Sequence, residues 1–224
     1  MKKQPQAAKS KIGAYLELSK PRILSLVLVS TVIGFVMGSD SSISWIQLGW
    51  TLFGTGLTAA GAGALNHYFE RNYDTLMERT KNRPIPAGIL SPAETLLFGT
   101  VLVLIGSAIL VMMINPLTGF LSILTAFLYN LVYTPLKRMT WLNTSIGSIP
   151  GALPPLGGWA AATGSLDSGA WILFAILYLW QHPHFYAIAW MCREDYSKAG
   201  FRMLPVLEPD GKRTMRQVFW HLFF

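Results

Sequence analysis

Four polar side chains recur at every fourth position in one stretch of the chain: Asn66, Glu70, Asp74 and Glu78. On an α-helix a step of four residues turns about 400° and rises ~6 Å, so these side chains form one slowly drifting stripe. Carboxylates at this spacing repel one another, and carboxylate and amide oxygens are the ligands that Mg²⁺ prefers. The stripe therefore predicts a magnesium site, at which the ion shares its ligand shell with substrate phosphates.

Basic side chains accompany this stripe, and their guanidinium and ammonium groups are suited to binding phosphate oxygens. They are Arg71, Arg79, Lys81 and Arg83. The alternative is a solvated helix end with mixed charges. The stripe begins inside an apolar run, where polar side chains are costly, and this favours a functional site.

The composition is that of a protein embedded in a membrane. Of the 224 residues, 52% are hydrophobic and only 13% are charged, whereas a soluble domain carries about 25% charged residues. The single cysteine, Cys192, excludes an intramolecular disulfide and a thiolate metal cluster, and we interpret it as an inert interface residue. The net charge of +7 lies in the tail and in loops between apolar runs, which argues against nucleic-acid binding.

Apolar runs predict an all-α, polytopic transmembrane bundle that forms a single domain over residues 1–224. Six spans are expected, at residues 23–37, 45–70, 93–114, 117–133, 141–162 and 169–190. The fifth contains Pro150, Pro154 and Pro155, and we expect it to be bent or broken, as is tolerated where a helix lines a cavity. A seventh span begins near Gln217 and reaches only Phe224, so we expect the chain to be incomplete at its C-terminus, with about six and a half helices present.

The N-terminal segment, residues 1–20, is short and basic. Ile12, Tyr15 and Leu16 stand at helical spacing among lysines, which suits a short helix on the membrane surface; a frayed tail is the alternative. Pro21 then begins the first span. A basic start before an apolar run is also typical of signal peptides, but no small-residue cleavage site follows, and the later spans favour an anchor.

The positive charges are segregated along the chain. All 18 lysines and arginines lie in the N-terminal tail or in loops 70–92, 134–140 and 191–216, whereas loops 38–44, 115–118 and 162–169 hold none. Positive loops mark the cytoplasmic side of a membrane protein. The N-terminus and the stripe are therefore predicted to face the cytoplasm, and we expect a bacterial cell membrane.

A second charged cluster follows the sixth span on the same predicted side. It comprises Arg193, Glu194, Asp195, Lys198 and Arg202. Two acidic clusters at one membrane face, each flanked by bases, fit a diphosphate held between metal ions and cationic side chains; an ordinary charged loop is the alternative. An apolar bundle below such a site suits a polyprenyl diphosphate, whose head is charged and whose tail is a hydrocarbon.

The same reading assigns roles to aromatic and imidazole side chains. Magnesium neutralises a leaving diphosphate, and aromatic faces stabilise an allylic cation and exclude water. The aromatic candidates are Phe127, Tyr129, Tyr133 and Trp180. His182 and His184 lie inside the sixth span, where a histidine is a functional candidate, and we favour His184. The alternative is that a histidine only satisfies the carbonyl that Pro183 leaves unpaired.

The chain resembles the UbiA superfamily of intramembrane prenyltransferases, and within it the members that farnesylate haem B. The matching segments are KPRI at 20–23, NHYFERNYDTLMERTKNRP at 66–84, YTPLKR at 133–138, the run 143–159 ending GALPPLGGW, and WQHPHFYAIAW with DYSKAGFRMLP within 180–205. They cover most of the chain in the family's order. The resemblance implies a bundle of nine helices around a central cavity, with a cytoplasmic cap.

The resemblance also implies the reaction and its ligands. A farnesyl group would pass from farnesyl diphosphate to a vinyl group of haem B, with addition of water, giving haem O and diphosphate for haem-copper terminal oxidases. Its implied partners are these two substrates, the lipid bilayer, and other proteins of haem biosynthesis or oxidase assembly. The implied cofactor is Mg²⁺.

The resemblance assigns site residues as well. Catalytic and metal-binding roles fall on Asn66, Glu70, Asp74 and Asp195. Asp195 matches less completely, because the superfamily's usual DxxxD is absent, and Lys137 or Lys198 is expected to take part of the second metal's role. Substrate binding is assigned to Arg71, Arg79, Lys81, Arg83, Tyr133, Lys137, Asn143, His184 and Lys198.

Two other functions stay open at this point. One is a UbiA-type enzyme that prenylates an aromatic quinone precursor, for which the WQHPHF segment has no evident use. The other is a transporter or channel with acidic gating residues. A transporter of this kind predicts inverted repeats with matched broken helices, and the sequence contains no convincing repeat.

Overall fold

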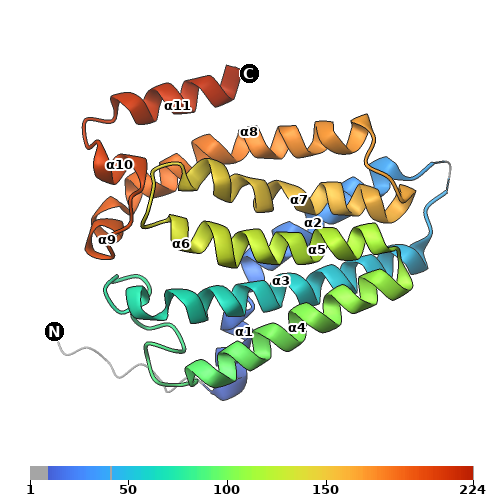
Figure 1. Cartoon of the computed structure of the whole chain (residues 1–224), viewed down its shortest axis with the longest axis horizontal. Helices are drawn as coiled ribbons and strands as arrows, with labels where there is room; N and C mark the ends of the chain where they lie inside the picture. Colours follow the sequence, from blue (N-terminus) through green and yellow to red (C-terminus); the bar gives the residue numbers. More distant parts are fainter. Residues whose placement is uncertain (1–9, 41, 224) are drawn as a thin grey trace.

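The chain folds into helices joined by short connections, with no β-strand among residues 10–40 and 42–223, which are the residues that the computed structural model describes (Figure 1). The helices are α1 (Lys11–Leu18), α2 (Pro21–Gly38), α3 (Trp45–Asp74), α4 (Pro92–Met113), α5 (Pro116–Phe127), η1 (Leu128–Tyr133), α6 (Thr134–Leu136), α7 (Asn143–Thr163), α8 (Ser168–Met191), α9 (Arg193–Lys198), α10 (Leu204–Leu207) and α11 (Lys212–Phe223). The all-α prediction is confirmed.

Each of the six predicted spans is helical, and the long helices lie side by side in alternating directions (Figure 1). Three segments are long and apolar enough to cross a membrane by length and composition, namely Pro21–Gly38, Pro92–Met113 and Pro116–Leu136. Helices α3, α7 and α8 are as long, with 30, 21 and 24 residues, and they pack among the apolar helices. The protein is therefore an integral membrane protein; the nine-helix count and the cap stay predictions.

The irregularity in the bundle lies in the fourth predicted span and not in the fifth. The expectation that the fifth span is broken is wrong, because α7 is continuous from Asn143 to Thr163 with its three prolines inside. Between α5 and α6 the chain instead forms the π-helix η1. There the Thr134 hydroxyl donates to the carbonyl of Tyr129 at 2.9 Å. Such π-helical turns occur frequently at functional sites.

The N-terminal helix expected at residues 10–20 is present as α1. The Ser10 hydroxyl accepts a hydrogen bond from the backbone N–H of Gly13, which caps the helix start. Ala14 and Leu18 are buried against Ala64 of α3 and Leu90, while the opposite face of α1 is exposed. Its place on a membrane surface stays a prediction, and residues 1–9 of the predicted tail lie outside the described part of the chain.

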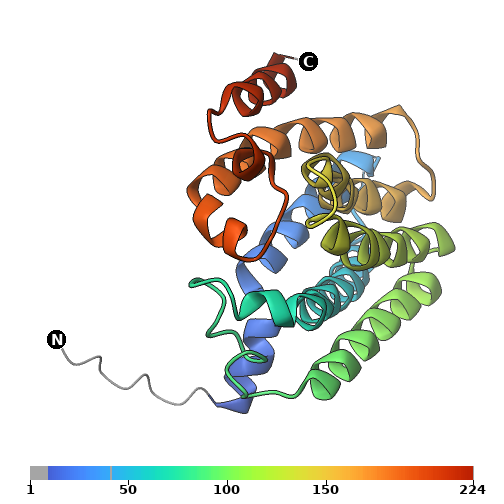
Figure 2. The same ribbon diagram turned by 60° about the vertical axis from the view of Figure 1, so that its left-hand side comes forward.

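The connections fall at two opposite ends of the bundle. One end, which we call the basic end, holds the start of α2, the end of α3 and the segments that follow α6 and α8 (Figure 1). The described lysines and arginines all lie at or next to it. Figure 2 shows α9 and the turn after α3 facing each other there, and Asp195 joins them through hydrogen bonds to the backbone N–H groups of Glu78 and Arg79.

Close helix contacts depend on glycine. A Cβ atom on Gly158 of α7 would overlap the carbonyl oxygen of Thr31 in α2, and a Cβ atom on Gly34 of α2 would overlap the carbonyl of Pro155 in α7. Small residues let two helix backbones approach in a bilayer, where apolar burial alone does not drive helices together. The neighbouring Gly157 has open space at its Cβ position.

This contrast predicts the stability of two matched variants. Gly158→Ala should lower the free energy of unfolding by about 1–3 kcal/mol, because the added methyl group overpacks the α2–α7 contact. Gly157→Ala should leave stability unchanged or raise it slightly, because alanine favours the helix and meets no neighbour. Thermal unfolding in detergent measures both. Equal melting temperatures for the two variants would contradict this packing.

The orientation in the membrane stays a prediction, and cysteine labelling tests it. The segregation of positive charge places the basic end in the cytoplasm. In a Cys192→Ser background, a cysteine at Ser165 should react with an impermeant thiol reagent added outside the cell, and a cysteine at Lys198 should react only after the membrane is opened. The reverse pattern would overturn the orientation.

Candidate functional site

The last two turns of α3 carry the centre of the site. Asn66, Glu70 and Asp74 share one face of this helix, and their exposed fractions are only 1%, 5% and 0%. The helix ends at Asp74, so Glu78 lies beyond it, exposed, and forms an ion pair with Lys81. Three members of the predicted stripe therefore lie together, and the prediction that Glu78 continues the stripe is wrong because the helix stops first.

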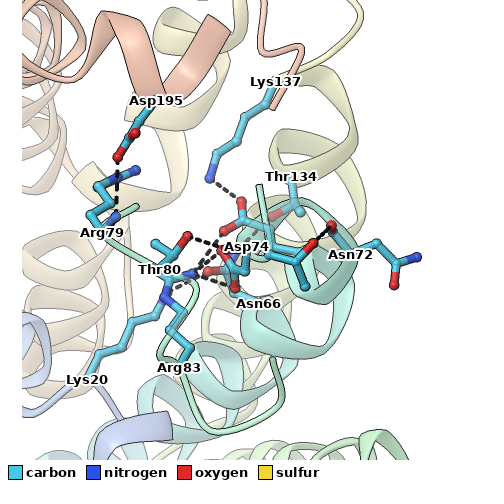
Figure 3. A network of polar contacts seen from close by, with 12 residues as sticks. Lys20, Asn66, Asn72, Asp74, Arg79, Thr80, Arg83, Thr134, Lys137 and Asp195 are labelled. Carbon is cyan, nitrogen blue, oxygen red and sulfur yellow. Dashed lines mark hydrogen bonds and ion pairs between the residues drawn. The ribbon is translucent and has the colours of Figure 1, made fainter. Parts of the chain in front are cut away.

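Three basic side chains meet this face from three other segments (Figure 3). Lys137, after α6, pairs with Glu70, and Lys20, before α2, donates to the amide oxygen of Asn66. Arg83, in the loop after α3, donates to both carboxylate oxygens of Asp74 at 2.8 Å. We call these six residues the polar cluster: Lys20, Asn66, Glu70, Asp74, Arg83 and Lys137.

Hydroxyl groups complete the hydrogen bonding of the polar cluster. The side-chain amide of Asn66 donates to the Thr134 hydroxyl at 3.0 Å, next to the π-helix η1. The Thr80 hydroxyl donates to the backbone carbonyl of Asp74 at 2.9 Å. Lys20 also donates to the Tyr129 hydroxyl at 3.2 Å. The site is therefore built from α2, α3, its following loop, and the η1–α6 region, all of which must pack for it to form.

The charges in the polar cluster do not balance. Burial alone would lower the pKa of Lys137, but the facing Glu70 carboxylate outweighs burial and raises it. Burial likewise opposes ionisation of Arg83, and Asp74 raises its pKa nevertheless. Lys20 has only an amide partner, so burial and then the charge of Arg83 lower its pKa to about 7. Three bases surround two carboxylates, and this arrangement attracts an anion.

Lys20 reaches the polar cluster through an unusual backbone conformation. Its φ of 49° is the only positive φ of a non-glycine residue among the residues that the structure describes. Such conformations are strained and are retained where the surrounding structure requires them. The sequence analysis quoted Lys20 only within KPRI and gave it no role. A lysine directly before a proline-led apolar span was the available signal; Thr134 and Thr80 carried none.

The donor atoms of the polar cluster fit magnesium, provided that a phosphate also binds. Two carboxylates and an amide supply oxygen ligands of the kind that Mg²⁺ prefers. No group of three or more His, Cys, Asp and Glu side chains able to hold a metal occurs among the described residues. An ion here would need further ligands from phosphate oxygens or water. The residues therefore fit a magnesium–diphosphate pair, with carboxylates for the metal and basic groups for the phosphates.

Asp195 lies outside the polar cluster (Figure 3). Its two carboxylate oxygens accept hydrogen bonds from the backbone N–H groups of Glu78 and Arg79, each at 3.3 Å, and Lys198 lies 3.9 Å away. The structure thus gives Asp195 a different role from the predicted metal ligand. It fastens α9 to the loop after α3, because its oxygens face that loop.

The other predicted substrate-binding residues divide between the polar cluster and its surroundings. The ring of Tyr133 adjoins it, with the ammonium nitrogen of Lys137 at 4.5 Å from the ring centroid. Arg71 instead donates to the Tyr68 carbonyl on its own helix. Asn143 is buried and donates to the backbone carbonyls of Thr140 and Arg202, so it holds the start of α7.

The two histidines of α8 have exchanged the expected environments. His182 is fully buried, donates from Nδ1 to the Tyr178 carbonyl at 2.8 Å, and stacks on His221 of α11 at 3.7 Å. His184 is exposed and stacks on Trp180. The expectation of a buried His184 is therefore wrong, since the helix periodicity turns it away from α7 and α11.

An apolar cavity lies deeper in the bundle than the polar cluster. Its walls come from α2, α3, α4, α5 and α7. Along α3 the lining runs from Thr55 to Ala62, which ends about one turn before Asn66. The remaining lining is mainly aliphatic, with hydroxyls from Thr118, Ser122 and Thr125. A charged site thus stands at one end of the helices, with apolar space below it.

Comparison with known proteins gives three concordant findings. The model of the UbiA prenyltransferase family matches residues 27–224. Protoheme IX farnesyltransferase of Solibacter usitatus (strain Ellin6076) is 46% identical over 213 residues, which cover 91% of this chain and 73% of that protein. Protoheme IX farnesyltransferase of Salinibacter ruber (strain DSM 13855 / M31) is 50% identical over 204 residues, covering 91% and 72%.

A solved structure shares the fold. The structure of a UbiA homolog from Archaeoglobus fulgidus bound to DMAPP and Mg²⁺ superposes with a TM-score of 0.74. The match covers 92% of this chain and 73% of that one, at 19% sequence identity. At this identity the likeness concerns the arrangement of the helices.

The buried Glu70–Lys137 pair predicts a stability cycle. Lys137→Met should lower the free energy of unfolding by about 3–5 kcal/mol, because it leaves the Glu70 carboxylate buried without a partner. Adding Glu70→Gln should recover part of that loss. Lys81→Met, at an exposed ion pair, should change stability by no more than about 0.5 kcal/mol. Thermal unfolding in detergent measures the series, and a double variant no more stable than Lys137→Met contradicts the pairing.

Proposed function

The chain belongs to the UbiA prenyltransferase family, and from this premise we propose that it transfers the farnesyl group of farnesyl diphosphate to a vinyl group of haem B. The names of the two relatives, both protoheme IX farnesyltransferases, support the choice of donor and acceptor. The observation that carries the proposal is the polar cluster, in which buried basic groups and oxygen donors lie at one end of an apolar bundle.

The basic residues of the polar cluster bind the diphosphate head of the donor in this proposal. An ammonium group has three N–H donors and a guanidinium has five, so Lys137 and Arg83 keep donors free while paired with Glu70 and Asp74. Lys20 has no carboxylate partner among the described residues, which leaves its charge for a phosphate oxygen. Binding an anion here relieves the excess of positive charge.

Asn66, Glu70 and Asp74 are the residues that would hold Mg²⁺. Bound magnesium neutralises the charge that develops on the leaving diphosphate. The homolog bound to DMAPP and Mg²⁺ supports a metal-dependent reaction. The three side chains are held in place by α3 and by their basic partners, so little reorganisation is needed when the donor binds.

The prenyl chain extends into the apolar cavity below the polar cluster. Tyr129 and Tyr133 of η1 stack with ring centroids 5.9 Å apart and adjoin the lysines of the polar cluster. Their faces are placed to stabilise a developing allylic cation. Phe127 and Trp180, the other aromatic candidates, are about half exposed on the outside of the bundle and have no contact with the polar cluster.

The bond changes of the proposed reaction balance as follows. The C–O bond between the farnesyl group and the diphosphate breaks, and the vinyl carbon forms a C–C bond to the farnesyl carbon. Water then adds at the carbon beside the porphyrin ring and loses one proton. The products are haem O, diphosphate and that proton. A water-poor cavity protects the cation until the acceptor reacts.

A pair of substitutions on α3 tests the function. Asp74→Asn should lower turnover at least about 100-fold, because it removes a metal-binding charge while keeping the side-chain shape. Arg71→Ala should keep turnover within about twofold, since Arg71 contacts only its own helix. Haem O formed from haem B, farnesyl diphosphate and Mg²⁺ is measured by mass spectrometry.

Two controls complete this experiment. Removing Mg²⁺ with a chelator should abolish product formation, and adding it back should restore it. An aromatic quinone precursor offered in place of haem B should remain unprenylated. Near wild-type turnover of Asp74→Asn at saturating Mg²⁺ removes Asp74 from the metal site, and a prenylated quinone precursor with unaltered haem B overturns the proposed acceptor.

A further inference from the structure

Two arginines at the basic end hold their guanidinium groups on aromatic faces and not against carboxylates. The guanidinium of Arg79 lies 4.8 Å from the ring centroid of Tyr196, and that of Arg193 lies 5.2 Å from the ring of Trp190. Neither guanidinium forms an ion pair within the described part of the chain. Stacking fixes each guanidinium plane and leaves its N–H edges open, which is the geometry for binding a carboxylate.

These arginines line one cleft of about 470 Å³ between the loop after α3 and the end of α8. Its lining is Arg79, Trp190, Met191, Cys192, Arg193, Glu194 and Asp195. Asp195 is taken up by backbone N–H groups and by Lys198, so it does not compete for the arginines. Glu194 is exposed at the rim. The cleft therefore offers two positioned guanidinium groups to an anionic ligand.

The cleft continues into an exposed stripe along α8. Trp180, His184, Ala187 and Met191 follow one another at steps of four, three and four residues, and all four are exposed. Met191 belongs both to this stripe and to the cleft lining. The imidazole of His184 stacks on Trp180, with centroids 5.0 Å apart and planes at 15°. The small side chain at Ala187 leaves room for a flat ring system between His184 and the cleft.

The cleft is joined to the polar cluster through a single loop. Arg79 precedes Thr80, whose hydroxyl donates to the backbone carbonyl of Asp74 at 2.9 Å. A ligand anchored by Arg79 is therefore held beside the proposed diphosphate site. The ordering of groups along the stripe, from acid-binding arginines to an imidazole in the apolar region, matches an amphiphilic metalloporphyrin with both acids on one edge.

We propose that the α8 stripe and this cleft are the porphyrin acceptor site, with His184 as a ligand of the haem iron and with Arg79 and Arg193 binding the two propionates. The inference rests on the proposed function and adds the acceptor's position. His184 and Met191 are seven residues apart, a rise of ~10 Å on a helix, comparable with the separation of iron and propionates in haem. A neutral imidazole is a common iron ligand.

The iron contact is tested by absorption spectroscopy of the purified full-length protein in detergent, titrated with ferric haem B. The wild type should give an imidazole-ligated spectrum. His184→Ala should lose that spectrum and bind haem at least about tenfold more weakly, and free imidazole should restore the spectrum. His221→Gln is the matched control: it removes an imidazole of the neighbouring helix α11, and its spectrum should equal that of the wild type.

The propionate contacts are tested by comparing haem B with its dimethyl ester, which lacks the two negative charges. The wild type should bind the ester at least about tenfold more weakly, because the charge-assisted hydrogen bonds to both arginines are lost. The Arg79→Met/Arg193→Met double variant should bind haem and ester equally. Farnesyl diphosphate binding, measured by calorimetry, should be the same in wild type and double variant.

The outcomes separate this inference from the function on which it rests. A wild-type protein that binds no haem overturns the proposed function. A protein that binds and farnesylates haem, but whose His184→Ala spectrum is unchanged, overturns the iron assignment alone. Equal wild-type affinity for haem and ester overturns the propionate assignment, and this comparison needs no variant. Thermal unfolding of each variant distinguishes a lost contact from a lost fold.

Discussion

The burial of two carboxylates in the end of an apolar helix bundle is the constraint on which the rest of this structure depends. Glu70 and Asp74 are nearly inaccessible, and an ionised carboxylate removed from water is stable only when a partner compensates it. Lys137 and Arg83 supply that compensation from segments that follow α6 and α3. The bundle therefore has to bring these segments together before α3 can bury its acidic face.

The same arrangement links stability to ligand binding. With Lys20 added, the basic groups outnumber the carboxylates, so the folded protein keeps an unbalanced positive charge in a buried place. A diphosphate removes this imbalance, and a divalent cation allows the carboxylates to take part in binding it. The groups that hold the fold together are thus the groups proposed to hold the donor, and a change in any one of them affects both properties.

The two ends of the bundle have different physical tasks. Along most of their length the helices are held by small residues that let backbones approach, as at Gly34 and Gly158, and apolar space remains between them. At the basic end, polar contacts replace close packing: Asp195 fastens α9 to the loop after α3, and Asn143 fastens α7 to the chain before α10. These contacts bring the polar cluster and the arginine-lined cleft to one loop, so that two substrates of opposite polarity can meet there.

The sequence by itself determined the features that depend on local periodicity. The helical spans, and the shared face of Asn66, Glu70 and Asp74, follow from a 3.6-residue repeat, which needs no knowledge of neighbours. Only the tertiary structure decided which groups meet that face. Lys20 lies 46 residues from Asn66, and Lys137 lies 67 residues from Glu70.

Pairing over such separations, like the turning of Asp195 toward a loop and the exposure of His184, depends on how helices pack and where α3 ends. Neither is written in the spacing of residues along one segment, because the same spacing is compatible with many neighbours. The helix pattern therefore gives the donor atoms of the site, and the packing of the bundle gives them their partners.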